Sequence, residues 1–266
     1  MKKYIYFHVA TVNHWKDVVG KIFSQIVDSG VYDEIDEIRL SVVGDIDEVK
    51  NALPDKVLPK CRFVINLNSY LSLTKNWLPM RRTFKLPMHN EELVFQHIQK
   101  TASKEDCYIL YMHAKGITHT KKSHIKNIGD WIDYLLHFNL YRHKEVFSKL
   151  QEYDAVGCEI IDRAANWGAR FVSEPENIGF ERIGMPSKHS KIWYKANFWW
   201  AKSSHIKKLS PKLYPNYSGP ELWLTAKPGK FLEMWHANID HLRHSYSKSN
   251  YSQQNSVHKE YIYEKI

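Results

Sequence analysis

The stretch CYILYMHAKG, residues 107–116, decides how this sequence folds. Its first six residues are apolar or aromatic, which predicts a buried strand. Side chains alternate along a strand, so His113 and Lys115 are expected on the same side of its end. Gly116 then permits a sharp turn. Because open α/β sheets bind ligands at the carboxyl ends of their strands, this stretch also marks the expected binding edge.

Strands and helices alternate on either side of this stretch. Apolar runs predict strands at 3–10, 37–43, 62–66, 107–113, 154–161 and 196–201. Periodic apolar residues predict helices at 14–29, 91–102, 129–151 and 203–209, and a short one inside 217–227. This alternation predicts an α/β fold with a Rossmann-like, doubly wound and mostly parallel sheet flanked by helices.

The length of 266 residues suits one large α/β domain. We assign residues 1–240 to a single domain whose C-terminal portion is irregular, since residues 162–192 are punctuated by Gly and Pro. From residue 241 the chain turns polar, and residues 241–266 are expected to form a tail that wraps the surface or frays.

The composition excludes several classes of protein. A hydrophobic content of 43% excludes a disordered chain, and 9 Trp, 16 Tyr and 11 Phe allow a large aromatic core. The three cysteines lie far apart, which excludes a disulfide framework and fits a reducing compartment. No apolar run reaches about 18 residues, so no transmembrane segment is expected and the predicted location is the cytoplasm.

The positive charge is concentrated in two windows. The sequence has 38 basic and 29 acidic residues, and neither residues 107–129 nor residues 182–220 contain Asp or Glu. Basic windows at strand ends suit a phosphate or a diphosphate, although solvated surface lysines would produce the same pattern. Glu221 is the first carboxylate after the second window.

Two later motifs carry candidate binding and catalytic residues. In KANFWWAK, residues 195–202, alternation sends Trp199 and Trp200 to opposite faces, so one face can pack in the core while the other lines a cleft. Asn197 could bond to hydroxyl groups, and the alternative is a purely structural core strand. In GPELW, residues 219–223, Glu221 suits a general base, and the alternative is a charge that stabilises a helix N-terminus.

Metal-binding patterns are sparse in this sequence. Asp45 and Asp47 form the single Asp-x-Asp, after the second strand, where a carboxylate suits a ribose or base better than a metal. Asp47 could instead start a helix as its N-cap. The spacing of His113, His119 and His124 fits no common zinc pattern. P-loop, Gly-x-Gly-x-x-Gly and Gly-x-Ser-x-Gly motifs are absent.

Taken in order, six motifs resemble those of GT-A-type glycosyltransferases from giant viruses and from bacterial capsule or lipopolysaccharide loci. The motifs are FHVATVNHW (7–15), VVGD (42–45), YILYMHAKG (108–116), YDAVG (153–157), NFWWAK (197–202) and GPELWL (219–224). This chain has Ala114 and Ala196 where the group usually has Thr and Gly. The Asp-x-Asp that usually ends the central strand of GT-A enzymes is replaced by His113-Ala114-Lys115.

The resemblance implies a GT-A-like fold and transfer of a sugar from a UDP-, GDP- or TDP-sugar to a hydroxyl of a glycan or glycoprotein, in the host cytoplasm if the protein is viral. It places Thr11, Asn13 and Asp45 near the nucleoside, His113, Lys115 and Lys121 at the diphosphate, Asn197, Trp199 and Trp200 around the sugar or acceptor, and Glu221 as the base.

Lysines could neutralise the diphosphate without a metal, so no cofactor is expected to be required, with Mn²⁺ or Mg²⁺ as the alternative. One good carboxylate candidate favours inversion by a single displacement. Interleaved aromatic and basic residues keep a nucleic-acid-binding protein without catalysis as the rival function, although no nucleic-acid-binding motif is recognisable. A sugar-binding module without turnover is the third reading.

Overall fold

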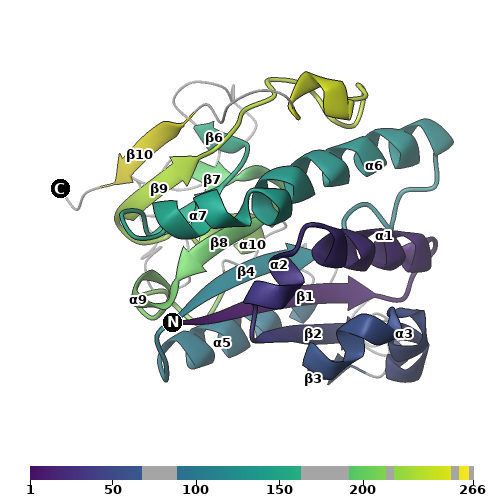
Figure 1. Cartoon of the computed structure of the whole chain (residues 1–266), viewed down its shortest axis with the longest axis horizontal. Helices are drawn as coiled ribbons and strands as arrows, with labels where there is room; N and C mark the ends of the chain where they lie inside the picture. The colour runs from purple at the N-terminus through teal and green to yellow at the C-terminus, as the bar shows by residue number, and fades with distance from the viewer. Residues whose placement is uncertain (68–88, 163–191, 214–218, 253–257, 264–266) are drawn as a thin grey trace, which may run out of the picture.

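A computed structural model gives the structure of the chain and describes residues 1–67, 89–162, 192–213, 219–252 and 258–263 (Figure 1). Its centre is an eight-stranded sheet with the strand order β10-β9-β5-β8-β4-β1-β2-β3. Helices pack against both faces, so the chain has an α/β fold. None of the helices in these ranges is long and apolar enough to cross a membrane.

Four parallel strands form the first half of the sheet. β1 (Lys2–Ala10) lies between β2 (Glu37–Val43) and β4 (Cys107–His113), and β3 (Cys61–Leu67) pairs with β2 at the edge. In this register His8 of β1 is the partner of both Ser41 of β2 and His113 of β4. The carboxyl ends of β1 and β4 therefore meet at one edge of the sheet, as the sequence predicts.

The second half of the sheet mixes directions. β8 (Trp199–Lys202) runs antiparallel to both β4 and β5 (Ala155–Gly157), and β9 (Gly229–Glu233) is parallel to β5. β10 (Lys259–Tyr263) closes the sheet antiparallel to β9. The sheet is therefore mostly parallel, with antiparallel pairs confined to the half that follows β4.

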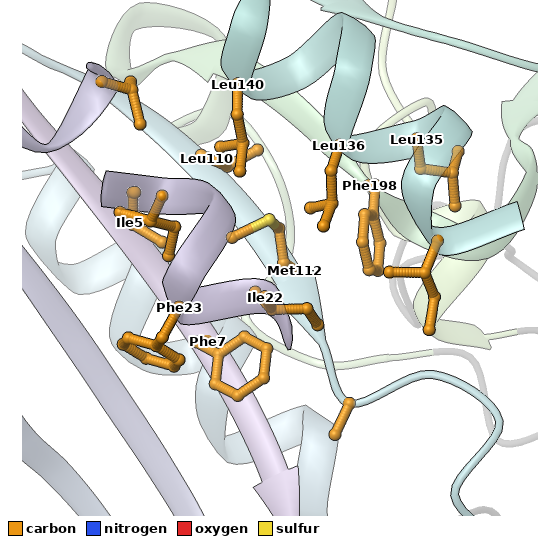
Figure 2. Packing of buried hydrophobic residues seen from close by; sticks show 14 of the residues in the cluster. Ile5, Phe7, Ile22, Phe23, Leu110, Met112, Leu135, Leu136, Leu140 and Phe198 are labelled. Atoms are coloured by element: carbon orange, nitrogen blue, oxygen red, sulfur yellow. The ribbon is translucent and has the colours of Figure 1, made fainter. Parts of the chain in front are cut away.

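The helices divide between the two faces of the sheet. One face is covered by α1 (Trp15–Asp28), α6 (Lys122–Leu136) and α7 (His143–Lys149), and the other by α5 (His89–Ala102), α9 (Ser203–Ile206) and α10 (Gly219–Trp223). Two short helices, α2 (Val31–Glu34) and α3 (Ile46–Ala52), flank β2 in the chain. Alternation along β1 explains the division, because Phe7 belongs to the core under α1 and Tyr6 to the core under α5. In Figure 2 the Phe7 ring meets Phe23 of α1 edge to face, with ring centres 5.3 Å apart.

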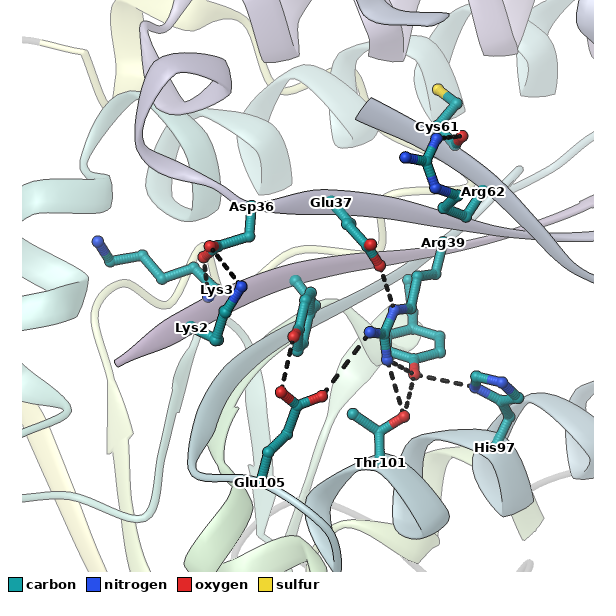
Figure 3. Close-up of polar contacts among 12 residues, drawn as sticks. Lys2, Lys3, Asp36, Glu37, Arg39, Cys61, Arg62, His97, Thr101 and Glu105 are labelled. Carbon is teal, nitrogen blue, oxygen red and sulfur yellow. Dashed lines mark hydrogen bonds and ion pairs between the residues drawn. The ribbon is translucent and has the colours of Figure 1, made fainter. Parts of the chain in front are cut away.

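A polar cluster holds the C-terminal half of α5 against the sheet (Figure 3). Arg39 of β2 donates from Nη1 to the Tyr6 hydroxyl at 2.9 Å and to the Thr101 hydroxyl of α5 at 2.8 Å. His97 Nδ1 lies 2.9 Å from the same Tyr6 hydroxyl. The helix α5 leads into the amino end of β4, so α5 itself begins at the edge of the sheet where the strands have their carboxyl ends. The polar cluster therefore helps to hold the first turn of α5 at this carboxyl edge.

Both tryptophans of the NFWWAK motif lie in the core. Trp200 is fully buried in the core under α6 and donates from Nε1 to the Asn139 carbonyl at 2.9 Å. Trp199 is fully buried on the other face, where its ring centre lies 5.5 Å from Tyr111 and 6.2 Å from Trp223. The expectation that one face of this strand lines a cleft is therefore corrected, because helices cover both faces of the sheet at β8.

Two predicted elements are interrupted, and a third begins later than expected. The helix expected at 129–151 begins at Lys122 and is broken by a π-helical turn, His137–Tyr141, before α7. The strand expected at 154–161 is split into β5 and β6 (Ile160–Asp162), which pairs with β7 (Ile192–Tyr194) in a second sheet. The split falls at Glu159, whose backbone is left-handed with a φ of 55°. The strand expected at 196–201 begins only at Trp199, because Ala196 and Asn197 are also left-handed, with φ values of 69° and 58°.

Residues 241–252 and 258–263 pack onto the domain, so of the two expectations for the tail, wrapping the surface fits these residues and fraying does not. His241 and Tyr251 are each 1% exposed. The His241 ring stacks on Trp131 of α6, with ring centres 4.8 Å apart and planes 6° from parallel. Aromatic residues within this polar segment explain the docking, and β10 then joins the sheet.

Candidate functional site

A cavity of about 350 Å³ opens at the carboxyl ends of β1 and β4. Its walls come from these strand ends, the first turn of α5, the loop after β4, α6, the turn before β8 and α10. The polar side chains that line it are those of His8, Glu91, His113, Lys115, Thr118, His119, Asn197 and Glu221. The cavity therefore lies where open α/β sheets bind their ligands, and it gathers four of the residues that the sequence predicts for the site.

The end of β4 delivers His113 and Lys115 to this cavity. Gly116 has a φ of +78°, and a Cβ at this position would lie 2.5 Å from Ile128 Cγ2, so glycine is required for the turn. The turn brings Lys115 Nζ to 3.9 Å from the centre of the Trp131 ring. This cation–π contact holds the ammonium group at the cavity wall.

The charge of Lys115 is set by burial and by two carboxylates. Burial lowers the pKa of Lys115 to about 8, with a further lowering by Lys195, while Glu221 and Glu91 oppose the shift. The side chain therefore carries a positive charge at neutral pH. A partly desolvated cation interacts more strongly with an anion than a solvated surface lysine does.

Glu221 lines the cavity from α10. Burial raises the pKa of Glu221, whereas Lys115, Lys195 and the backbone N–H of Ala196 lower it. The carboxylate therefore has a cation and a hydrogen-bond donor that favour its ionised form, and burial makes it a stronger base. These properties suit a group that accepts a proton.

Glu91 is a second carboxylate in the cavity that sequence reasoning did not identify. It lies in the first turn of α5, and its Oε1 accepts a hydrogen bond from the Tyr111 hydroxyl at 2.6 Å. Burial raises the pKa of Glu91 to about 7, Glu221 raises it further, and Tyr111 and Lys115 lower it. In sequence, an acidic residue in the first turn of a helix reads as a stabilising charge. The available signal was that this helix leads into the strand that ends at His113.

Two of the cavity histidines, His8 and His113, are uncharged at neutral pH. Burial lowers the pKa of His8 to about 4, and burial together with Lys115 and His8 holds the pKa of His113 well below its usual range. His8 Nδ1 lies 3.1 Å from the Ser41 hydroxyl, and His113 Nδ1 lies 4.0 Å from Glu91 Oε1. Both rings therefore serve as neutral polar groups.

Asn197 is held in the wall by its neighbour. The side chain is 1% exposed, and its Oδ1 accepts a hydrogen bond from Trp199 Nε1 at 2.6 Å. This bond fixes the amide orientation and leaves Nδ2 without a hydrogen-bond partner among the described residues. Trp199 therefore acts on the cavity through Asn197, and neither Trp199 nor Trp200 lines it.

Four other residues of the predicted site lie outside the cavity lining, namely Asn13, Thr11, Lys121 and Asp45. Asn13 borders the cavity, because its Nδ2 donates to the carbonyl of Ile117, a lining residue, at 2.8 Å. Thr11 follows β1 and packs against Gly44, where a Cβ would lie 1.9 Å from Thr11 Oγ1. Lys121 is exposed at the start of α6.

Asp45 has a structural role that differs from the one expected. It is the N-cap of α3, and its Oδ1 accepts hydrogen bonds from the backbone N–H groups of Asp47 at 2.8 Å and Glu48 at 3.2 Å. The expectation that Asp47 caps this helix is therefore wrong, since Asp47 lies in the first turn. Capping uses the same carboxylate that was expected to face the nucleoside.

Groups of three or more His, Cys, Asp or Glu that could hold a metal ion do not occur within the described ranges. His119 lines the cavity and its ring centre lies 5.7 Å from that of His124, whereas His113 lies beside Glu91. No protein family, no curated protein and no solved structure matches the chain.

Proposed function

We propose that the chain is a glycosyltransferase that moves a sugar from a nucleoside-diphosphate donor to a hydroxyl group of a glycan or glycoprotein. One observation carries the proposal: Lys115 and Glu221 line the same cavity at the carboxyl ends of the parallel strands β1 and β4. The first supplies a cation for a diphosphate and the second a base for a hydroxyl. The order of the sequence motifs supports the same assignment.

The departing nucleoside diphosphate gains negative charge as the glycosidic bond to the phosphate breaks. In this proposal Lys115 stabilises that charge, and its position above Trp131 limits the reorganisation needed during the reaction. Mn²⁺ or Mg²⁺ is the alternative source of this stabilisation, and the experiment below includes it.

Glu221 accepts the proton of the acceptor hydroxyl as its oxygen attacks the anomeric carbon. Lys115, Lys195 and the Ala196 N–H favour the ionised form that this role requires. A direct displacement by the acceptor inverts the configuration. Glu91 supplies a second carboxylate, but a carboxyl group with a pKa of about 7 is half protonated at neutral pH, so a single displacement remains the proposed route.

The first experiment measures thermal unfolding with UDP, GDP, TDP and their sugar derivatives, each with and without Mn²⁺. A ligand that binds only the folded chain, at 100 times its dissociation constant, stabilises it by about 2.7 kcal/mol. We expect a shift with one nucleotide class without metal and no shift in Lys115→Met. A shift that requires Mn²⁺ would contradict the metal-free arrangement.

Turnover completes the test. Release of nucleoside diphosphate in the presence of an acceptor is expected from the unmodified chain and not from Glu221→Gln, which should bind the donor normally. Glu152→Gln is the matched control, since Glu152 is exposed and precedes β5 at the opposite edge of the sheet. Salt-sensitive binding of single-stranded DNA with no nucleotide effect would favour the nucleic-acid-binding alternative.

A further inference from the structure

We propose that Glu91 is the general acid of this reaction and protonates the departing diphosphate oxygen while Glu221 deprotonates the acceptor. This inference rests on the proposed glycosyl transfer and assigns its second proton. It starts from geometry, because Glu91 and Glu221 reach the same cavity from α5 and α10 with Lys115 on the wall contributed by the loop after β4.

The position of the Glu91 carboxyl group is fixed by its neighbours. Tyr111 donates its hydroxyl hydrogen to Glu91 Oε1 at 2.6 Å. The Tyr111 ring is fully buried, with its centre 4.6 Å from Phe95 and 5.5 Å from Trp199, so it cannot swing away. With Oε1 held as an acceptor, Oε2 is the oxygen that carries a proton in the acid form.

The surroundings separate the two carboxyl groups into an acid and a base. The groups that face Glu91 are Tyr111, His113 and Lys115 from β4 and its loop, and Glu221 from α10. Burial and Glu221 raise the pKa of Glu91 to about 7, so a proton is available near neutral pH. Glu221 has the additional help of Lys195 and the Ala196 N–H for its ionised form. Two carboxyl groups in one site with different surroundings are typical of acid–base pairs.

His113 is excluded as the acid by the same surroundings. Burial, Lys115 and His8 hold the pKa of His113 well below its usual range, so its protonated form is scarce at neutral pH. Lys115 keeps its charge as the electrostatic partner of the diphosphate. His119 also lines the cavity, and burial together with His124 and Lys115 lowers its pKa. Glu91, with a pKa of about 7, is then the group in the described cavity wall that best suits proton donation near pH 7.

The protons and electrons balance over one turnover. The acceptor oxygen forms a bond to the anomeric carbon and passes its proton to Glu221. The bond from that carbon to the β-phosphate oxygen breaks, its electron pair stays on the oxygen, and this oxygen takes the proton from Glu91. Glu221 ends protonated and Glu91 ionised. Transfer of one proton from Glu221 to Glu91 through solvent restores the starting state, so the acceptor proton ends on the diphosphate.

The experiment compares pH profiles of kcat for the unmodified chain, Glu91→Gln, Tyr111→Phe and the control Glu152→Gln. We expect the unmodified chain to lose activity above about pH 7, as Glu91 ionises. Glu91→Gln should lower kcat about 100-fold or more and remove the loss of activity near pH 7. A separate loss above about pH 8 should remain in this variant, because Lys115 gives up its charge there. Because Tyr111 lowers the pKa of Glu91, Tyr111→Phe should move the loss near pH 7 to higher pH. Glu152→Gln should retain the unmodified profile.

A second donor separates acid catalysis from a positioning role. A glycosyl donor with a dinitrophenolate leaving group, the anion of a stronger acid than the terminal phosphate, needs no proton on departure. It should therefore react at similar rates with Glu91→Gln and the unmodified chain. Equal loss with both donors would overturn the inference, as would an unchanged loss of activity near pH 7 in Glu91→Gln.

The two proposals fail in different ways. Absence of transfer from every nucleotide sugar by the unmodified chain would end the proposed function, and the inference with it. If Glu91→Gln transfers sugar as fast as the unmodified chain, the inference is overturned and the proposed function is not. If Glu91→Gln does not fold, the pH profile of Tyr111→Phe tests the inference in its place. A loss of activity that stays at the same pH in Tyr111→Phe would contradict Glu91 as the group that causes it.

Discussion

Lys115 Nζ lies 3.9 Å from the centre of the Trp131 ring, and the same ring is stacked on His241 with centres 4.8 Å apart. The indole therefore joins the cation of the cavity to the C-terminal segment of the chain. Leu242, the next residue, lines the cavity itself. Residues far apart in sequence thus position one charge, and the C-terminal segment contributes Leu242 to the cavity wall.

Replacement of this cation tests the electrostatics of the cavity directly. Lys115 lowers the pKa of Glu91, so Lys115→Met is expected to raise that pKa above its value of about 7. The measurement is the infrared titration of buried carboxyl groups, with Glu91→Gln to identify the signal. A Glu91 titration that stays in place, or moves to lower pH, would contradict the described coupling.

Asn197 is expected to stabilise the fold through Trp199. Asn197→Ala removes the acceptor 2.6 Å from Trp199 Nε1 and also places alanine at a φ of 58°. An orphaned buried donor costs about 1–3 kcal/mol, and the left-handed backbone adds about 1 kcal/mol for a residue with a Cβ. Asn197→Gly keeps the first cost and avoids the second. Urea unfolding should therefore rank the unmodified chain above Asn197→Gly and Asn197→Gly above Asn197→Ala.

Gly44 is expected to tolerate no side chain. It has a φ of +130°, and a Cβ there would lie 1.9 Å from Thr11 Oγ1. Gly44→Ala should lower the free energy of unfolding by about 2 kcal/mol or more, since strain and a steric clash act together. Gly20→Ala is the matched control, because Gly20 lies within α1 with no atom within 4 Å of its added Cβ. Similar losses in the two variants would contradict this account.

Acid is expected to destabilise the fold between about pH 6.5 and pH 4. Burial lowers the pKa of His8 and of His137 from 6.5 to about 4, so in this range the unfolded chain binds protons that the folded chain does not. Each such group changes the free energy of unfolding by up to about 1.4 kcal/mol per pH unit. Thermal unfolding across this range should show a falling midpoint as pH falls.

Glu91 affects the pH dependence of stability in the opposite direction to the two histidines. Its pKa is raised from 4.5 to about 7, so the folded chain binds the extra proton and gains stability as pH falls through 7 towards 4.5. Removing this group should make the loss in acid steeper. The midpoint of Glu91→Gln is therefore expected to fall more than that of Glu152→Gln between pH 7 and pH 4.5, and equal slopes would contradict the raised pKa.

Local sequence signals predicted the elements of the parallel half well. Apolar alternation and length placed β2 and β4 at their observed bounds, and α1 and α5 within two residues. The splits at Glu159 and at Ala196-Asn197 were missed, because left-handed backbone at non-glycine residues leaves no reliable sequence signal.

The residues of the candidate site also include some that the sequence predicted and some that it did not. His113, Lys115, Asn197 and Glu221 were predicted from strand ends and isolated charges, and the structure brings them to one cavity. Trp199 and Trp200 were expected at a cleft, but the number of faces that a strand buries depends on helices elsewhere in the chain. Glu91 was missed for a related reason, since its partner Tyr111 is 20 residues away.

The sequence by itself determined the parallel strands, their alternation of faces and the polar residues at the carboxyl end of β4, because these depend on local periodicity and on Gly116. Only the tertiary structure decided which side chains share the cavity and how their protons are held. Burial, and the distances between charges on α5, α10 and the loop after β4, set the pKa values of Glu91, Lys115 and Glu221. Those quantities arise when distant segments pack together, since desolvation and charge coupling depend on position in space.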